Sequence, residues 1–127
     1  MQTVRTGAFG AVVAVTACML AAACSPNGKF GKPISPARET PILDITSDPE
    51  SFKGRTVMVR GQIATVDGDG MGFNLDNGRS VLLYVKVAGD FKISKVARYR
   101  LATAEGVVEV DAKSGKPQLR ATGVEVK

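Results

Sequence analysis

Downstream of Gly54, hydrophobic residues recur at every second position, which is the pattern of strands that bury one face. The first such segment surrounds Val57–Ile63, and Gly61 lies where a bulge or sharp coil would fall. Turns rich in Asp and Gly separate it from two further segments. The expected inward residues of these three strands are Val57, Val59 and Ile63, then Met71, Phe73 and Leu75, then Val81, Leu83, Val85 and Val87. We expect the three strands to form a meander.

Two more strands are predicted after a break in this alternation. Residues 88–96 lose the period of two and are expected to hold a short helix or an irregular crossing. The apolar members of that segment are Phe91, Ile93 and Val96. Strand character returns over Tyr99–Asp111, and a turn at Ser114–Pro117 leads into a last strand, Gln118–Val126. The order of elements predicts a mainly β fold, a small five-stranded Greek-key barrel.

A short helical turn is predicted before the first strand, over Asp48–Lys53. Ser47 is a candidate N-cap, and Glu50 follows it at the spacing of a capping box. Pro49 suits the first turn of a helix, and Gly54 suits a C-terminal stop. The barrel is therefore expected to carry one or two short helices.

The N-terminal region contains an apolar run, Gly7–Ala23, which follows a lone Arg5 and ends at Cys24. A basic start, an apolar stretch and small residues before a cut are typical of a secretory signal peptide. Ala22-Ala23-Cys24 resembles the lipobox of bacterial lipoproteins. This resemblance implies a signal peptide over residues 1–23, a diacylglyceryl lipid on Cys24 and attachment to a membrane of the bacterial cell envelope. Cys18, which follows Val15-Thr16-Ala17, is the alternative lipidation site.

Residues 24–41 are predicted to form a lipidated flexible tether. The segment is rich in Pro and Gly, and its apolar members are Phe30, Ile34 and Ala37. So little apolar surface does not offset the entropy lost on ordering the chain. The folded domain is then expected over residues 42–127. The chain has a net charge of +5, of which +2 remains on residues 42–127.

Four stretches of the domain resemble an OB-fold. They are Phe52–Ile63, Gly72–Gly78, Gly106–Asp111 and Pro117–Ala121, and the likeness spans about residues 48–127. Together with the signal peptide, the chain is similar to exported bacterial OB-fold (BOF) proteins. OB-folds commonly bind oligonucleotides or oligosaccharides on their second and third strands. The outward residues expected on such a ligand-binding surface are Arg60, Gln62, Asn74, Tyr84 and Lys86.

Composition narrows the chemistry of this surface. The chain has no His, and residues 42–127 have no Cys, so the usual zinc sites, Cys nucleophiles and His bases are absent. Asp67 and Asp69 resemble the start of a calcium loop, but Met71 and Gly78 occupy later ligand positions. We therefore expect no metal, no cofactor, no catalytic residues and no enzyme activity.

The resulting hypothesis is a lipid-anchored binding module on the extracytoplasmic side of the cell envelope. Its expected partners are the membrane, through the N-terminal lipid, and an envelope protein, a glycan or a small anionic ligand. A structural or stress-tolerance lipoprotein without a defined ligand is one alternative. An oligonucleotide-binding domain is the other, but a near-neutral domain with Tyr84 as the only aromatic on the outer face does not favour it.

Overall fold

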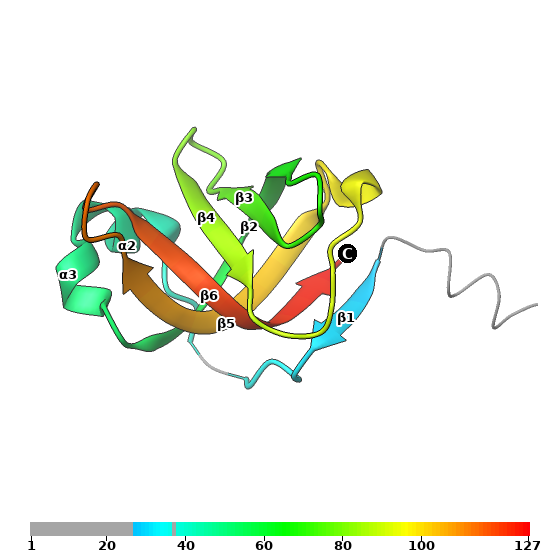
Figure 1. Cartoon of the computed structure of the whole chain (residues 1–127), viewed down its shortest axis with the longest axis horizontal. Helices are drawn as coiled ribbons and strands as arrows, with labels where there is room; N and C mark the ends of the chain where they lie inside the picture. Colours follow the sequence, from blue (N-terminus) through cyan, green and yellow to red (C-terminus); the bar gives the residue numbers. More distant parts are fainter. Residues whose placement is uncertain (1–26, 37) are drawn as a thin grey trace, which may run out of the picture.

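The computed structural model describes residues 27–36 and 38–127, and these fold into a closed five-stranded barrel (Figure 1). The barrel strands are β2 (Thr56–Val66), β3 (Gly72–Asp76), β4 (Leu82–Val87), β5 (Leu101–Val110) and β6 (Pro117–Val126). Their order is β6-β4-β3-β2-β5, and β5 pairs back onto β6 to close the barrel. The β4–β6 pairing is parallel, and the other pairings are antiparallel. The prediction of a small OB-fold-like barrel is confirmed.

Most of the residues that the alternation placed inward lie in the core of the barrel, whereas Met71 and Val81 are only partly buried against it. Val59, Ile63, Phe73 and Leu75 are completely buried. On β4, the side chains of Leu83, Val85 and Val87 are also buried, whereas Leu82 and Lys86 are exposed. Each strand thus has one face in the core and one face available for function.

The bulge in β2 lies at Ala64 and not at Gly61. The register between β2 and β3 shifts between Ile63 and Thr65, so Ala64 has no partner in β3. Gly61 instead keeps regular pairing with β5. A Cβ on Gly61 would lie 2.6 Å from the carbonyl oxygen of Asp76, so this glycine serves a close approach of β3.

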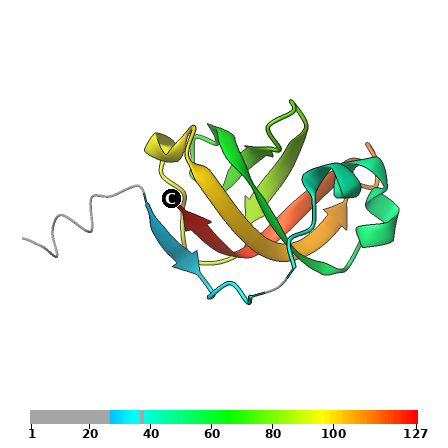
Figure 2. The same cartoon turned by 180° about the vertical axis from the view of Figure 1, so that it is seen from behind.

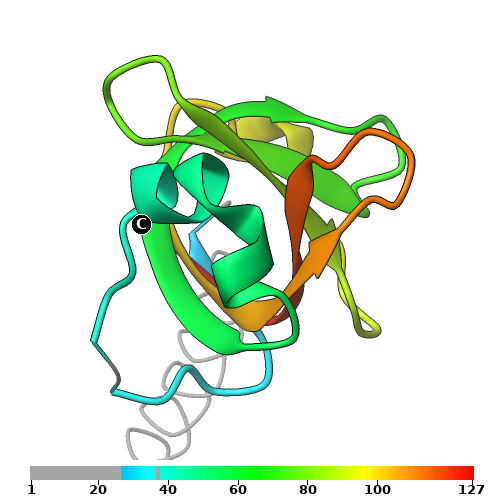
Figure 3. The same ribbon diagram turned by 90° about the vertical axis from the view of Figure 1, so that its left-hand side faces the viewer.

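Two short helices, α2 (Ile42–Ser47) and α3 (Pro49–Phe52), lie across one end of the barrel (Figure 3). Ile42 and Ile45 of α2 are buried in the core. The helical turn predicted over Asp48–Lys53 is present as α3, but the prediction of Ser47 as its N-cap with a capping box is wrong. Asp48 is the N-cap of α3, its side chain makes no capping bond, and Ser47 ends α2. A residue before proline disfavours helical backbone, so Pro49 forces the break at Asp48.

The segment between β4 and β5 is an irregular crossing with one 3₁₀ turn, η1 (Lys95–Ala97). Ser94 caps this turn, because its hydroxyl accepts a hydrogen bond from the amide of Val96. Of its apolar residues, Ile93 and Ala97 are buried, whereas Val96 is exposed. The crossing therefore presents an aliphatic side chain to solvent.

A sixth strand, β1 (Gly28–Gly31), lies within the predicted tether and pairs with the second half of β6 (Figure 2). The amide of Lys32 continues this pairing through a 2.8 Å bond to the carbonyl of Thr122. Phe30 packs against the core and stacks on Phe91 with ring centroids 6.4 Å apart. The prediction of a flexible tether is wrong for residues 28–32, because β6 extends beyond β4 and offers unpaired backbone groups there.

The predicted signal peptide and the candidate lipidation sites, Cys18 and Cys24, lie outside the described residues. Among residues 27–36 and 38–127, no helix has the length and apolar character needed to cross a membrane.

Candidate functional site

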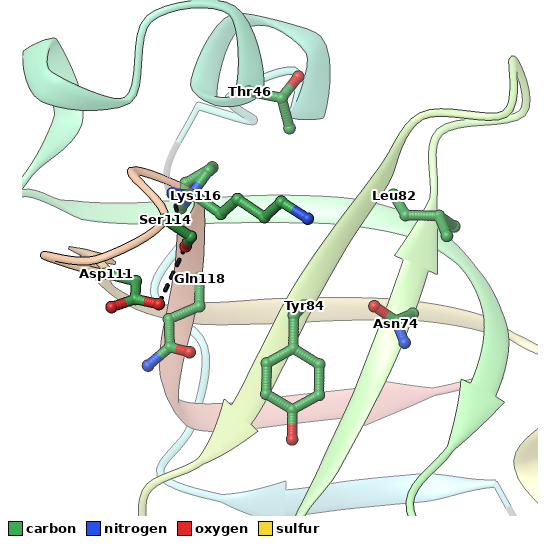
Figure 4. A pocket seen from close by; sticks show the side chains of 9 residues that line it. Thr46, Asn74, Leu82, Tyr84, Asp111, Ser114, Lys116 and Gln118 are labelled. Atoms are coloured by element: carbon green, nitrogen blue, oxygen red, sulfur yellow. Dashed lines mark hydrogen bonds between the residues drawn. The ribbon is translucent and has the colours of Figure 1, made fainter.

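A hollow of about 550 Å³ opens on the outer face of β3 and β4, beside the turn between β5 and β6 (Figure 4). Strands β3 and β4 correspond to the second and third strands of the OB barrel, where ligands commonly bind. The lining residues are Thr46, Asn74, Leu82, Tyr84, Asp111, Ser114, Lys116, Pro117 and Gln118. We call this site the Tyr84 hollow.

Tyr84 is held in place by a carboxylate from the β2–β3 turn. Its hydroxyl donates a 2.5 Å hydrogen bond to Oδ2 of Asp67. A Cβ on Gly72 would collide with both groups, so this glycine makes the pairing possible. The hydrogen bond to Asp67, then burial, then the negative charges of Asp67 and Asp69 raise the pKa of Tyr84 to about 12. Tyr84 thus stays a neutral hydrogen-bond donor at physiological pH.

Asn74 lies directly across from Tyr84 on the neighbouring strand. Its amide nitrogen donates a 2.9 Å bond to the hydroxyl of Thr65 on β2. In a cross-strand pair the side chains on one face are near neighbours. The amide is therefore fixed beside the tyrosine ring.

The opposite wall of the hollow is the β5–β6 turn, which Asp111 organises. The Asp111 carboxylate accepts bonds from the amide of Lys113 (3.0 Å) and the hydroxyl of Ser114 (2.9 Å). These two bonds, the backbone bond first, lower the pKa of Asp111. Gly115 completes the turn with φ of 71°, a conformation that favours glycine.

Two polar side chains of the hollow have no hydrogen-bond partner among the described residues. They are Lys116 and Gln118, at the start of β6. An amide offers both a donor and an acceptor, and a lysine offers donors only. With Asn74 and the Tyr84 ring nearby, the hollow presents amides, one cation and an aromatic surface. The charged residues of the lining are Lys116 and Asp111, so the lining is neutral overall.

The structure brings together two of the five residues that the sequence placed on a ligand-binding surface. Asn74 and Tyr84 both line the Tyr84 hollow. Arg60 lies elsewhere, beside Leu101 at the opposite end of the barrel. Gln62 donates its amide hydrogen to the carbonyl of Tyr99, at 3.0 Å. Lys86 is exposed on β4 but does not line the hollow.

The sequence interpretation missed the wall of the hollow contributed by α2, the β5–β6 turn and β6. Ser114 and Lys116 were recognised as turn residues only, and Gln118 only as the start of a strand. Carrying the alternation into β6 places Gln118 and Arg120 outward, opposite the buried Leu119. The parallel pairing of Gln118 with Tyr84 joins the two walls, and no local sequence pattern predicts this pairing.

Within residues 27–36 and 38–127, no group of three or more Asp, Glu, Cys or His side chains is arranged to hold a metal ion. No protein-family model matches the chain, and no curated protein matches its sequence.

Several solved structures share the fold. An aspartyl-tRNA synthetase from Entamoeba histolytica aligns with a TM-score of 0.56 and 16% identity, over 76% of this chain and 24% of the synthetase. The OBody AM2EP06, solved bound to hen egg-white lysozyme, aligns at 0.55 and 14% identity, over 74% of this chain and 96% of the OBody. The YgiW protein of E. coli aligns at 0.52 and 14% identity, over 79% of this chain and 99% of YgiW. At these identities the comparisons show an OB-fold module, which is a small part of the synthetase.

Proposed function

We propose that this protein is a lipid-anchored, non-catalytic OB-fold module of the bacterial cell envelope that binds a glycan in the Tyr84 hollow. The observation that carries the proposal is the position and lining of the hollow. It lies on the face of the barrel that OB-folds use for oligosaccharides and oligonucleotides, and the β5–β6 turn forms one of its walls.

The lining favours a glycan over a polyanion. Sugar hydroxyls both donate and accept hydrogen bonds, and the amides of Asn74 and Gln118 offer both kinds of group. The Tyr84 ring adds an apolar surface for the sugar ring. A single-stranded nucleic acid requires a basic groove with several aromatic platforms. The hollow has one lysine, one tyrosine and one carboxylate.

The lipid anchor rests on the sequence of the N-terminus. Stable attachment requires two acyl chains, which a diacylglyceryl group on Cys24 supplies. No catalytic step is assigned, because the Asp111 carboxylate that lines the hollow is already engaged by its own turn.

Glycan binding is tested by titrating the isotope-labelled protein with envelope oligosaccharides and recording amide and side-chain NMR shifts. We expect saturable shifts centred on Asn74, Tyr84 and Gln118. Replacing Gln118→Ala should weaken binding about fivefold, since one hydrogen bond contributes roughly 1 kcal/mol. Thr103→Ala, on the far end of β5, is the matched control and should leave affinity unchanged.

A response to single-stranded oligonucleotides alone would assign the hollow to nucleic acid. A flat response to every glycan, nucleotide and envelope protein would favour the structural role without a ligand. The anchor is tested separately. Cys24→Ser should move the protein from the detergent phase to the aqueous phase, and intact mass should show an acylated Cys24 at the new N-terminus. A mature chain beginning at Cys18 would correct the cleavage site.

A further inference from the structure

Three of the five large hydrophobic side chains that are exposed in the described part of the chain lie at the end of the barrel opposite α2. Val96 is 67% exposed, Tyr99 63% and Leu101 59%. All three lie within the short segment Lys95–Leu101, which contains η1 and the first residue of β5. Scattered exposed hydrophobics are ordinary, but three in one short segment indicate a contact surface.

The backbone of this segment is held rigidly while its side chains face outward. Tyr99 has φ of 72°, a conformation that bulky residues rarely adopt. Its amide donates a 2.7 Å bond to the carbonyl of Ile63, and its carbonyl accepts the 3.0 Å bond from Gln62. The barrel therefore fixes Tyr99 in an unfavourable backbone geometry with its ring exposed, which favours a functional reason for the exposure.

Cations surround these hydrophobic side chains. The segment itself contains Lys95, Arg98 and Arg100, and residues 91–104 include no acid. The Arg98 guanidinium lies 4.7 Å from the centre of the Tyr99 ring. Arg60 and Lys127 flank Leu101, with Glu125 as the acid beside them. We call Lys95–Leu101, Arg60 and Lys127 together the Tyr99 end.

The N-terminal strand enters the barrel at this same end (Figures 1 and 2). Gly28, the first residue of β1, is the pairing partner of Val126. The amide of the next residue, Lys127, donates a 2.9 Å bond to the carbonyl of Leu101. An attachment point upstream of Gly28 therefore keeps the Tyr99 end of the barrel close to it.

We propose that the Tyr99 end lies directly against the anionic lipid headgroups of the membrane. This inference rests on the lipid anchor of the proposed function. Four chain steps separate Cys24 from Gly28, and a fully extended chain covers about 14 Å in that distance. Strand β6 has ten residues and is about 33 Å long. The anchor thus keeps the Tyr99 end near the surface and turns the Tyr84 hollow, at the other end, away from it.

The chemistry of the Tyr99 end fits a bilayer surface. Aliphatic and aromatic side chains enter the boundary between headgroups and acyl chains, and basic residues around them attract anionic lipids. Single-stranded nucleic acid instead favours several aromatic stacking platforms along a groove. Tyr99 is the only aromatic residue in Lys95–Leu101.

The test uses the lipidated full chain on vesicles of phosphatidylcholine, with or without phosphatidylglycerol. A spin label at Val96→Cys is compared with one at Leu43→Cys, an exposed aliphatic position on α2. With phosphatidylglycerol present, the label at 96 should lose severalfold in its collision rate with a water-soluble relaxation reagent. The label at 43 should not change. Equal exposure of both labels would overturn the proposal.

A second experiment removes positive charge from the Tyr99 end. Lys95→Gln with Arg100→Gln should shift the docked population about 25-fold toward the free state, at roughly fivefold per basic residue. Lys53→Gln with Lys113→Gln, which removes equal charge near α3 and the β5–β6 turn, should leave docking unchanged. No difference between these variants, or tighter binding of single-stranded oligonucleotide than of anionic vesicles, would overturn the proposal. Flotation on phosphatidylcholine alone reports the anchor, so failure of the anchor is seen independently.

Discussion

The two tyrosines of the chain occupy surfaces of opposite character on one barrel. Tyr84 is partly buried, and its hydroxyl is tied to the Asp67 carboxylate. Tyr99 is mostly exposed, and its ring lies under a cation, Arg98. The first belongs to a concave and nearly neutral site, and the second to a basic and apolar end.

This difference indicates two different kinds of partner. Polar groups that are fixed before a ligand arrives reduce the entropy that binding must overcome, so the Tyr84 hollow suits a small polar ligand. Exposed aliphatic side chains among basic residues suit a broad, deformable surface. A domain with one site of each kind can present a ligand-binding face outward while its other end meets the membrane.

The largest expected effect on stability comes from Val59→Asp, which places a carboxylate in the core that supports both surfaces. Val59 is completely buried on β2, and an unpaired carboxylate there costs several kcal/mol. Domains of this size are stable by about 5–15 kcal/mol in total. We expect the cooperative thermal transition and both binding activities to disappear together.

The matched control is Thr56→Asp, on the same strand but exposed. It should change the free energy of unfolding by less than about 1 kcal/mol. A sharp melt of Val59→Asp would contradict the burial of that strand face.

A smaller effect separates the two tyrosines. Tyr84→Phe removes the donor to Asp67 and leaves a carboxylate without that partner, so we expect a loss of roughly 1–2 kcal/mol in unfolding free energy. Tyr99→Phe removes a hydroxyl that bonds to no described residue, and we expect a change within about 0.5 kcal/mol. Urea denaturation of both variants measures the comparison. Equal losses would show that Tyr84 is not specially held.

The sequence predicted those features of the fold that depend on neighbouring residues, and it missed features that depend on distant parts of the chain. The inward residues of β2, β3 and β4 follow from a period of two, and they are buried. Strand β1 was missed, because its four residues are half glycine and it gains its stability only from the free edge of β6. Pro49 lies in the first turn of α3 as predicted, whereas α2, a six-residue helix with Pro41 at its N-cap position, was not placed by the sequence.

The candidate site was predicted in part for the same reason. Asn74 and Tyr84 lie outward on adjacent antiparallel strands, so the alternation of inward and outward residues is enough to bring them together. Gln118 joins them through a parallel pairing with β4, across more than thirty residues of sequence. Arg60 and Gln62 lie on the outer face as predicted but toward the Tyr99 end, because β2 coils around the barrel. The alternation of a strand predicts which face of the sheet a residue lies on, but not how far along that face it lies.

The pH dependence of Tyr84 sharpens the comparison further. Its folded pKa of about 12 lies above the ordinary value of 10.0. The stability that its hydroxyl contributes is therefore fully present below about pH 10 and is lost as the pH rises through about 12. The difference in stability between wild type and Tyr84→Phe should shrink across that interval. In Tyr99→Phe, ultraviolet absorbance should show the remaining tyrosine ionising near pH 12, and ionisation near pH 10 would refute the bond to Asp67.

The smallest expected effect concerns the turn that forms the outer wall of the Tyr84 hollow. The two hydrogen bonds from the turn lower the pKa of Asp111 below its ordinary 3.8, so their contribution is present above that value and is lost as the pH falls through the folded pKa. Asp111→Asn retains an acceptor oxygen but does not titrate. Thermal melts of both proteins from neutral to acidic pH should therefore show wild type slightly more stable at neutral pH, with the difference vanishing on acidification. The effect is small because Asp111 is exposed to solvent.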